Sequence, residues 1–224
     1  MDNSTSQHIE VREDGKSYLL YDWYPKAIPE NVLTAEMTYL DTMYSFAGFH
    51  SEKPNGFELG FGSGNYLHSH FFTGPGGRIS VGKYVILEAT NIIANEEVVI
   101  GDHCMFSWGS CVTDTWLSEA TFATDIRKKI LEQLSASEHR SLYIPTPKPV
   151  IIEDNVWVGF DAVIMPGVRL GRGCVVGCKT VIWEDVPPYA VIAGEPARIV
   201  KYLPADDTSE EKNKAIKLYQ KFVK

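Results

Sequence analysis

The stretch IEDNVWVGFDAVIMPGVRLGRGCVVGCKTVIWEDV, residues 152–186, repeats with a period of six residues. An aliphatic residue returns at every sixth position, and the residue four places after it is always small or β-branched. The aliphatic set is Ile152, Val158, Ile164, Leu170, Val176 and Ile182, and the small set is Val156, Ala162, Val168, Cys174, Thr180 and Val186. This period fits neither an amphipathic helix, which repeats every 3.6 residues, nor a strand of simple alternation.

Units of six residues instead predict short strands joined by tight corners. The aliphatic residue would point into a narrow core and the small residue would fit the crowded corner, where Gly159, Gly171 and Gly177 would relieve the backbone. Three such units make one three-sided coil, and stacked coils bury each other's faces. We therefore predict an all-β solenoid, a parallel β-helix, in which residues 152–187 form two complete coils.

Looser repeats extend the pattern toward the N-terminus. The core positions expected there are Val81, Leu87 and Ile93, followed after a slip of one residue by Ile100, Phe106 and Val112. Leu59 marks an earlier start. Residues 28–46 combine a helix-like spacing of apolar residues with strand-forming residues, and we expect an irregular first coil there.

Two segments depart from the repeat. Residues 113–149 lack it, and their TDIRKKILEQL stretch places apolar residues on one side of a helix: Ile126, Ile130, Leu131 and Leu134. A long loop that projects from a solenoid is more often functional than structureless. Near the end, Thr208 and Glu211 have the spacing of a capping box, which predicts a C-terminal α-helix over 208–224.

The expected organisation is a single domain over residues 1–224. Its parts are an irregular N-terminal coil (1–78), the β-helix (79–112 and 150–200), the projecting helical loop (113–149) and the C-terminal helix (208–224).

Composition excludes several classes of protein. The 224 residues are 44% hydrophobic and 22% charged, which argues against wholesale disorder. A net charge of −8 disfavours a nucleic-acid partner. No stretch approaches the roughly 18 apolar residues of a membrane span, and the polar, acidic start is not typical of a signal or transit peptide. With four cysteines and no disulfide framework, we expect a cytoplasmic protein.

Residues 152–203 resemble the hexapeptide-repeat acyltransferases, most specifically in the DNVWVG step and the closing DVPPYAVIAGEPARIV. The similarity is to the branch that acetylates sugars, galactosides, maltose and some antibiotics. It implies a left-handed β-helix, an exception to right-handed crossovers, and a homotrimer with acyl-CoA in a groove between neighbouring helices. It also implies acetyl-CoA as co-substrate, no bound cofactor or metal, and a small hydroxyl- or amine-bearing acceptor, with a sugar favoured.

The resemblance assigns residues to the acetyl-CoA site. Trp157, Gly159 and Phe160 fall where relatives pass the pantetheine arm, and Gly177 and Cys178 fall beside its tail. Further assignments are Trp183 beside the adenine, Arg198 and Lys201 as cations for the phosphates, and Asn91 for the acceptor hydroxyl. Glu184 stands where many relatives have a lysine, and its charge would repel phosphates.

The general base departs from the family pattern. Relatives have a histidine in the projecting loop soon after an aspartate, and here Asp114 is present but no histidine occurs from 104 to 138. His139 is the nearest candidate, with Asp114 as the group that would orient it, and His103 is the second. A different base, or unassisted attack by an amine held in place, also stays open.

Two other functions stay open. The missing loop histidine would suit a non-catalytic trimeric scaffold. Alternatively, His68 and His70 lie 33 to 35 residues before His103, close to two coils, and three histidines could hold a zinc ion, as in carbonic-anhydrase-like hexapeptide proteins. Cys104 and Cys174 occupy small corner positions, which predicts core packing rather than metal binding.

Overall fold

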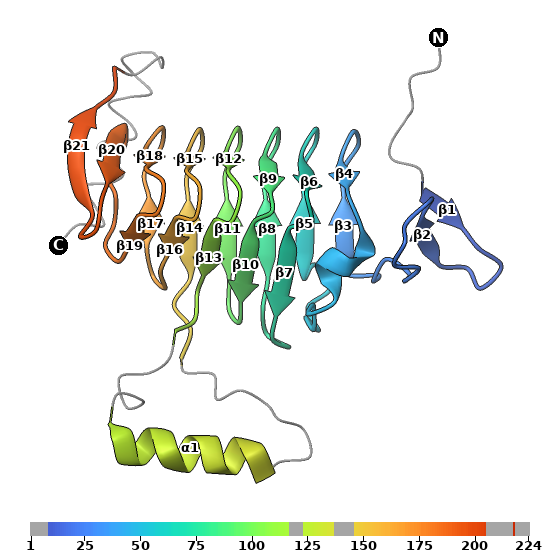
Figure 1. Cartoon of the computed structure of the whole chain (residues 1–224). Helices are drawn as coiled ribbons and strands as arrows, with labels where there is room; N and C mark the ends of the chain where they lie inside the picture. Colours follow the sequence, from blue (N-terminus) through green and yellow to red (C-terminus); the bar gives the residue numbers. More distant parts are fainter. Residues whose placement is uncertain (1–8, 117–122, 137–145, 205–216, 218–224) are drawn as a thin grey trace.

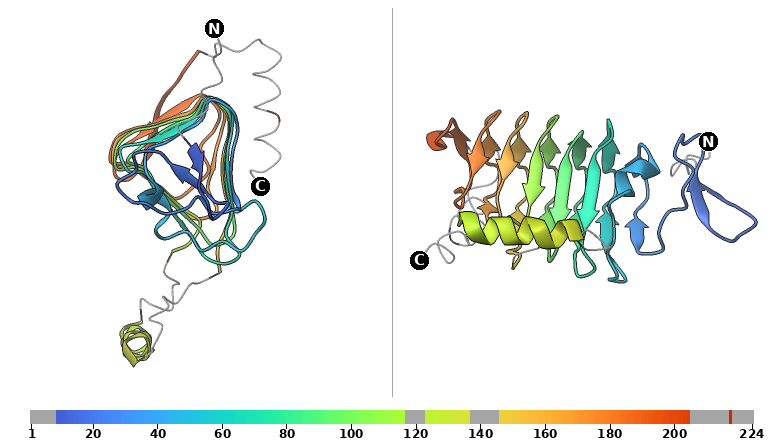
Figure 2. Two further views of the ribbon diagram at one scale, coloured as in Figure 1. Left: turned by 90° about the vertical axis from the view of Figure 1, so that its right-hand side faces the viewer. Right: turned by 60° about the horizontal axis from the view of Figure 1, so that its bottom comes forward.

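The structure, a computed structural model, describes residues 9–116, 123–136, 146–204 and 217. Within these residues the main body is a three-sided stack of short parallel strands, with one sheet on each side (Figures 1 and 2). The chain passes through a six-stranded, an eight-stranded and then a five-stranded sheet before starting the next coil. This is the predicted β-helix, and its path is consistent with the left-handed form.

The three sheets are built from strands that recur in the same order. The six-stranded sheet contains β3 (Val32–Thr34), β5 (Phe57–Leu59), β8 (Ile79–Val81), β11 (Val98–Ile100), β14 (Val150–Ile152) and β17 (Arg169–Leu170). The eight-stranded sheet contains β4 (Tyr39–Leu40), β6 (Gly64–Tyr66), β9 (Ile86–Glu88), β12 (Met105–Phe106), β15 (Trp157–Val158), β18 (Val175–Val176), β20 (Ala190–Ala193) and β21 (Arg198–Tyr202). The five-stranded sheet contains β7 (His70–Thr73), β10 (Asn91–Ala94), β13 (Cys111–Thr113), β16 (Val163–Ile164) and β19 (Val181–Ile182).

Three corners connect these sheets. The first corner leads from the six- to the eight-stranded sheet, the second from the eight- to the five-stranded sheet, and the third back to the six-stranded sheet. Tight corners call for left-handed backbone. In the first corner it recurs at Tyr84, His103, Asn155, Gly173 and Tyr189, all with φ between 55° and 67°.

The core confirms the register predicted for residues 152–186. Every aliphatic position of the repeat is at most 1% exposed, and every small corner position is at most 2% exposed. Burying such side chains contributes about 1.5–3 kcal/mol each, relative to exposure. The six-residue period therefore reports directly on which side chains face inward.

One upstream core residue was predicted wrongly. Ile93 is only half-buried, whereas its neighbours Ile92 and Ala94 are fully buried. In the pairing of β10 with β13, Ile92 lies opposite Val112. The coil thus reaches its next inward position five residues after Leu87 rather than six, and a shift of one residue exchanges the two faces of a strand.

The stack begins upstream of residue 79. β3 pairs in parallel with β5, and β5, β6 and β7 form a coil that pairs with the next one. The earliest coil is irregular, because the 3₁₀ helix η1 (Met43–Phe46) takes the place of a strand in the five-stranded sheet. An antiparallel hairpin of β1 (Ile9–Val11) and β2 (Ser17–Leu19) precedes it.

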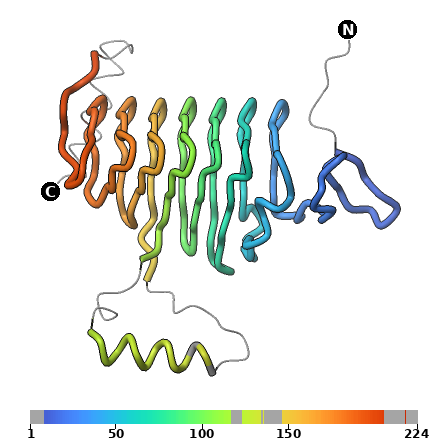
Figure 3. Tube along the Cα trace, viewed as in Figure 1, coloured from blue at the N-terminus to red at the C-terminus, as the bar shows by residue number. Residues whose placement is uncertain are grey.

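The projecting loop leaves β13 and returns at β14, at the third corner (Figure 3). It contains α1 (Thr124–Ala136), so the expected helix is present. Ile126 and Leu131 on this helix are exposed. The predicted C-terminal helix lies outside the described residues, apart from Lys217. No helix in the described parts of the chain is long and apolar enough to cross a membrane.

Replacing Ile164 by Asp should abolish cooperative folding. The side chain is fully buried among apolar neighbours, so an unpaired carboxylate there would cost several kcal/mol, out of a total stability of about 5–15 kcal/mol. Val163→Asp, on the half-buried outer side of the same strand, is the matched control. Thermal unfolding followed by circular dichroism would contradict the register if Ile164→Asp melted like the parent protein.

Candidate functional site

The second corner brings together most of the residues assigned to acetyl-CoA. Gly159 and Phe160 enter this corner in one coil, and Gly177 and Cys178 enter it in the next. The Gly159 N–H donates to the carbonyl of Val176 at 2.8 Å, which fixes the two coils in register. The predicted neighbours therefore form one continuous strip of surface.

Glycine is required in this strip by the stacking of coils. A Cβ atom at Gly159 would lie 2.8 Å from the backbone nitrogen of Cys178, and a Cβ atom at Gly177 would lie 2.7 Å from the Cβ of Ala193. Such distances are shorter than real Cβ contacts. Both missing side chains would have pointed into the next coil, so the two glycines allow the coils of the strip to stack closely.

Aromatic side chains line the strip. The rings of Trp108 and Phe160 meet edge to face at 5.9 Å, and the Trp157 Nε1–H donates to Ser107 Oγ at 3.2 Å. Trp157, Trp108 and Phe160 are 45%, 53% and 46% exposed. Trp108 was not expected from the sequence, although it occupies the corner position of Phe160 one coil earlier.

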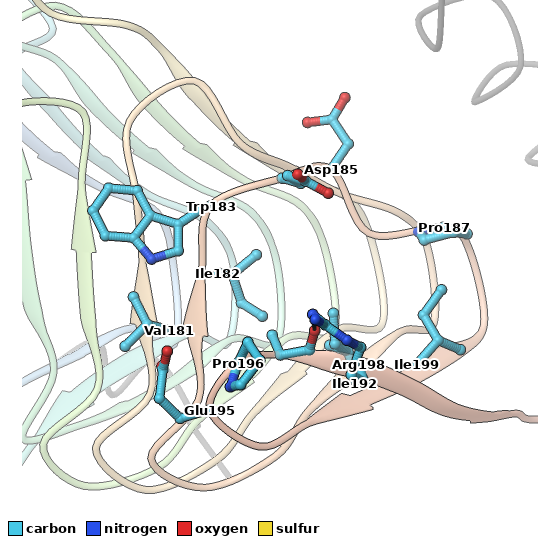
Figure 4. A pocket seen from close by; sticks show the side chains of 12 residues that line it. Val181, Ile182, Trp183, Asp185, Pro187, Ile192, Glu195, Pro196, Arg198 and Ile199 are labelled. Carbon is cyan, nitrogen blue, oxygen red and sulfur yellow. Dashed lines mark hydrogen bonds between the residues drawn. The ribbon is translucent and has the colours of Figure 1, made fainter.

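A pocket of about 500 Å³ lies at the C-terminal end of the stack, between β19 and the β20–β21 hairpin (Figure 4). Trp183 and Arg198, which the resemblance assigns to the adenine and the phosphates, both line this pocket, and Lys201 lies on β21 beyond it. The described lining of the pocket holds one cation, Arg198, and three acids, Glu184, Asp185 and Glu195. The Trp116 ring, at the start of the projecting loop, meets the Trp183 ring edge to face at 6.1 Å.

Asp114 is fully buried where the projecting loop leaves the stack. Its carboxylate accepts hydrogen bonds from the backbone N–H groups of Asn95, Glu96 and Glu97, at 2.7–3.0 Å, and from the hydroxyl of Thr115 at 2.6 Å. Both carboxylate oxygens therefore accept hydrogen bonds from the described residues. These bonds hold residues 95–97, the third corner of the preceding coil, in place. The Asp114 carboxylate therefore has a structural role that does not depend on a nearby histidine.

The sequence-based candidates for the base are not brought together. His139 lies outside the described residues. His103 is exposed at the first corner, where its ring stacks on Tyr84 at 5.2 Å. Asn91 begins β10, directly after the second corner, and Asp114 lies at the third. His103 therefore shares a corner with neither of them.

A different histidine lies beside Asn91. In the parallel pair of β7 and β10, His70 is the partner of Asn91. His70 is half-buried, and its ring contacts those of Tyr44 at 5.3 Å and Phe72 at 5.9 Å. Burial lowers the pKa of His70, and His68 adds a smaller effect in the same direction. The sequence offered little sign of this pairing, because the coil spacing there is irregular.

The proposed zinc ligands also occupy different corners. His68 lies in the second corner and His70 directly after it, whereas His103 lies in the first corner. Among the residues that the structure describes, no group of three or more metal-ligating side chains comes together. Cys104 and Cys174 are buried core residues, as predicted, and burial raises the pKa of Cys104 to about 12.

Comparisons with known proteins agree with this architecture. The family model for the bacterial transferase hexapeptide (six repeats) matches residues 149–182. A 2,3,4,5-tetrahydropyridine-2,6-dicarboxylate N-acetyltransferase from Brevibacillus brevis is 48% identical over 59 residues, which is 26% of this chain. The chain spans about a quarter of the length of the curated relatives that it matches, 25% in this case.

Solved structures extend the similarity over most of the chain. A hexapeptide-repeat acetyltransferase from Vibrio cholerae is 25% identical, with a TM-score of 0.54, over 72% of this chain and 78% of its own. An N-acyltransferase from Bacillus cereus, solved with dTDP-4-amino-4,6-dideoxyglucose and coenzyme A, has a TM-score of 0.55 at 17% identity. It covers 84% of this chain and 88% of its own, and shows that the fold is shared.

Replacing Asp114 by Ala should destabilise the fold whatever its part in chemistry. The change would leave several backbone N–H groups of residues 95–97 without their acceptor, and each unsatisfied buried donor costs about 1–3 kcal/mol. We expect a loss of at least about 2 kcal/mol in urea unfolding. Asp125→Ala, on the exposed surface of α1, should change stability by less than about 0.5 kcal/mol. Equal stability of the two variants would contradict the structural assignment of Asp114.

Proposed function

We propose that this hexapeptide-repeat chain is an acetyltransferase that moves an acetyl group from acetyl-CoA to a hydroxyl or amine of a small acceptor, with a sugar favoured. The observation that carries the proposal is the glycine-and-aromatic strip of the second corner, formed by Trp157, Gly159, Phe160, Gly177 and Cys178. The match of residues 149–182 to the transferase hexapeptide repeat supports it, as does the similarity to the acetyltransferase from Vibrio cholerae.

In this proposal the pantetheine arm runs along the second corner. The arm would lie along the closely stacked coils at Gly159 and Gly177, and Trp157 and Phe160 would supply apolar contact. The nucleotide end would lie toward Trp183. Because Glu184 and Glu195 line the nearby pocket, the phosphates would avoid that wall and pair with Arg198 and Lys201.

The chemistry requires a nucleophile, a base and a leaving thiol. The acceptor oxygen or nitrogen attacks the thioester carbon, the C–S bond breaks, and the acceptor proton ends on the sulfur of free coenzyme A. Backbone N–H donors at a corner would stabilise charge on the thioester oxygen. The loop histidine His139 and the corner histidine His103 are the bases suggested by the sequence. We further propose that the reaction takes place in the cytoplasm, with support from four unpaired cysteines.

A non-catalytic scaffold is the second candidate. Two observations favour it: the acidic residues that share the pocket lining with Arg198 would weaken the hold on phosphates, and the Asp114 carboxylate is occupied by backbone donors.

We also propose that the protein assembles as a homotrimer. Ile86, Met105 and Trp157 are partners across adjacent strands, so they form one row on the outer face of the eight-stranded sheet. They are 41%, 40% and 45% exposed. A contiguous apolar row of this kind is typical of a surface that meets a partner. A neighbouring chain would supply the opposite wall of the acetyl-CoA groove.

Acetyl-CoA should bind the parent protein and should bind Trp157→Ala at least about tenfold more weakly, since an aromatic contact of roughly 1.5 kcal/mol is lost. Leu33→Ala, a similarly exposed change on the six-stranded sheet, is the matched control. Titration calorimetry gives the affinities, and thiol release with hexoses, amino hexoses, nucleotide sugars and aminoglycosides identifies the acceptor. A parent protein that fails to bind acetyl-CoA at millimolar concentration would favour the scaffold.

The assembly is tested by light scattering. The parent protein should have a mass of about 75 kDa, three times the 25.1 kDa of one chain. Met105→Glu would place a charge in the apolar row and should shift the mass toward the monomer. A parent protein that is monomeric at micromolar concentration would disprove the trimer.

A further inference from the structure

We propose that His70, a residue of the coil itself rather than of the projecting loop, is the general base that deprotonates the acceptor. This inference rests on the acetyltransferase function proposed above and adds the residue that performs its proton transfer. Neither the sequence pattern nor the resemblance pointed to His70 in this role.

The position of His70 follows from the pairing of strands. His70 and Asn91 are partners in adjacent parallel strands, and Cys111 and Val163 continue the same outward row. Strands in a sheet lie about 4.8 Å apart, so His70 is one strand from Asn91 and about 14 Å from the row position of Val163. An extended thioester arm that follows the corner from Gly159 toward the N-terminal coils would bring its carbonyl into this region.

His70 also directly follows the same corner that carries the strip. In the coil of β6 and β7 the second corner comprises residues 67–69, directly before His70, and in later coils it carries Trp108, Phe160 and Cys178. The strip that we propose binds acetyl-CoA and the His70 side chain therefore lie along one edge of the solenoid. His103, at the first corner, does not share this edge.

Aromatic side chains form a wall beside the imidazole. Tyr44 contacts the His70 ring at 5.3 Å, and Trp23 contacts Tyr44 at 5.3 Å. Trp23 is 63% exposed and Tyr44 is 40% exposed. These rings offer a flat apolar face next to a base and to the Asn91 amide, which suits a ring-shaped acceptor with polar substituents.

The surroundings keep the imidazole neutral. The groups that face it are Tyr44 from η1, Asn91 from β10, Phe72 along β7, and His68, whose Nδ1 lies 3.4 Å from Asp41 Oδ2. The Asp41 carboxylate is engaged by His68. Burial and, to a smaller extent, His68 lower the pKa of His70. The neutral form, which is the form that accepts a proton, therefore persists below the ordinary histidine pKa of about 6.5.

The proton transfer can be written as one balanced sequence. A neutral His70 takes the proton from the acceptor O–H or N–H as that atom attacks the thioester carbon. When the tetrahedral intermediate collapses, the C–S bond breaks and the imidazolium returns its proton to the departing thiolate. The products are the acetylated acceptor and free coenzyme A, and His70 is neutral again.

The inference is tested with His70→Asn and with the matched control His50→Asn, an exposed histidine near the third corner. The acceptor is whichever compound of the screen gives the fastest thiol release. We expect kcat of His70→Asn to fall about 100-fold or more, with acetyl-CoA affinity unchanged, and His50→Asn to behave as the parent. For His70→Ala, added imidazole should restore part of the rate, which a merely structural residue would not allow.

The pH profile provides an independent readout. The acid limb of kcat/KM should fall at a pH below about 6.5, because protonation of His70 removes the base. His68→Asn removes a like charge beside His70, and this change raises the pKa of His70. The acid limb of that variant should therefore move to higher pH.

The outcomes separate this inference from the function on which it rests. A parent protein that transfers to none of the acceptors overturns the acetyltransferase and the base assignment together. A parent protein that is active, alongside an equally active His70→Asn, overturns only the base. Loss of activity in His139→Ala but not in His70→Asn would also overturn it and return the base to the loop.

Discussion

The structure depends on the close stacking of one coil on the next. Every coil donates and accepts backbone hydrogen bonds with its neighbours along three sheets. In the regular coils, the core between the sheets holds one aliphatic and one small corner side chain from each six-residue unit. Little space remains between coils: a methyl group at Gly159 would meet the backbone of Cys178. This constraint sets the six-residue period, the small residues at corners, and the bare backbone of the proposed donor strip. The glycines that allow the coils to stack are thus also part of the strip proposed to bind acetyl-CoA.

The sequence predicted the fold where coil length is constant. Between residues 152 and 186 every unit of strand and corner is six residues long, so Ile164 and Leu170 could be assigned to the core from spacing alone. Upstream, the coil that carries Leu87 reaches Ile92 after five residues, and fixed spacing selected Ile93 instead. Where the corners vary in length, a fixed six-residue spacing no longer identifies the inward residues, although the strands remain hydrophobic.

The same limitation explains which parts of the site were predictable. Gly159, Phe160, Gly177 and Cys178 lie in the regular coils, and the structure stacks them in adjacent coils as their spacing implied, whereas their part in binding acetyl-CoA stays a prediction from the resemblance. His70 and Asn91 lie in coils of unequal length, so their pairing appears only in three dimensions. Asp114 was predicted to orient the catalytic histidine, and that role stays a prediction. However, its contacts are with the backbone of residues 95–97, and backbone contacts leave no pattern in the sequence.

The place where the loop leaves the stack affects how the chain folds. β11 and β14 are adjacent strands, yet Val98 pairs with Val150, 52 positions later. Closing so long a connection carries an entropic cost, which rises by about 0.6 kcal/mol for each doubling of length. In a solenoid each coil is stabilised mainly by contacts with the adjacent coils. The contacts between the β11–β13 coil and the β14–β16 coil must therefore offset the entropic cost of closing the loop. The solenoid therefore has a seam at that junction: the coils on either side of it can form from local contacts, whereas pairing across it must also close the long loop.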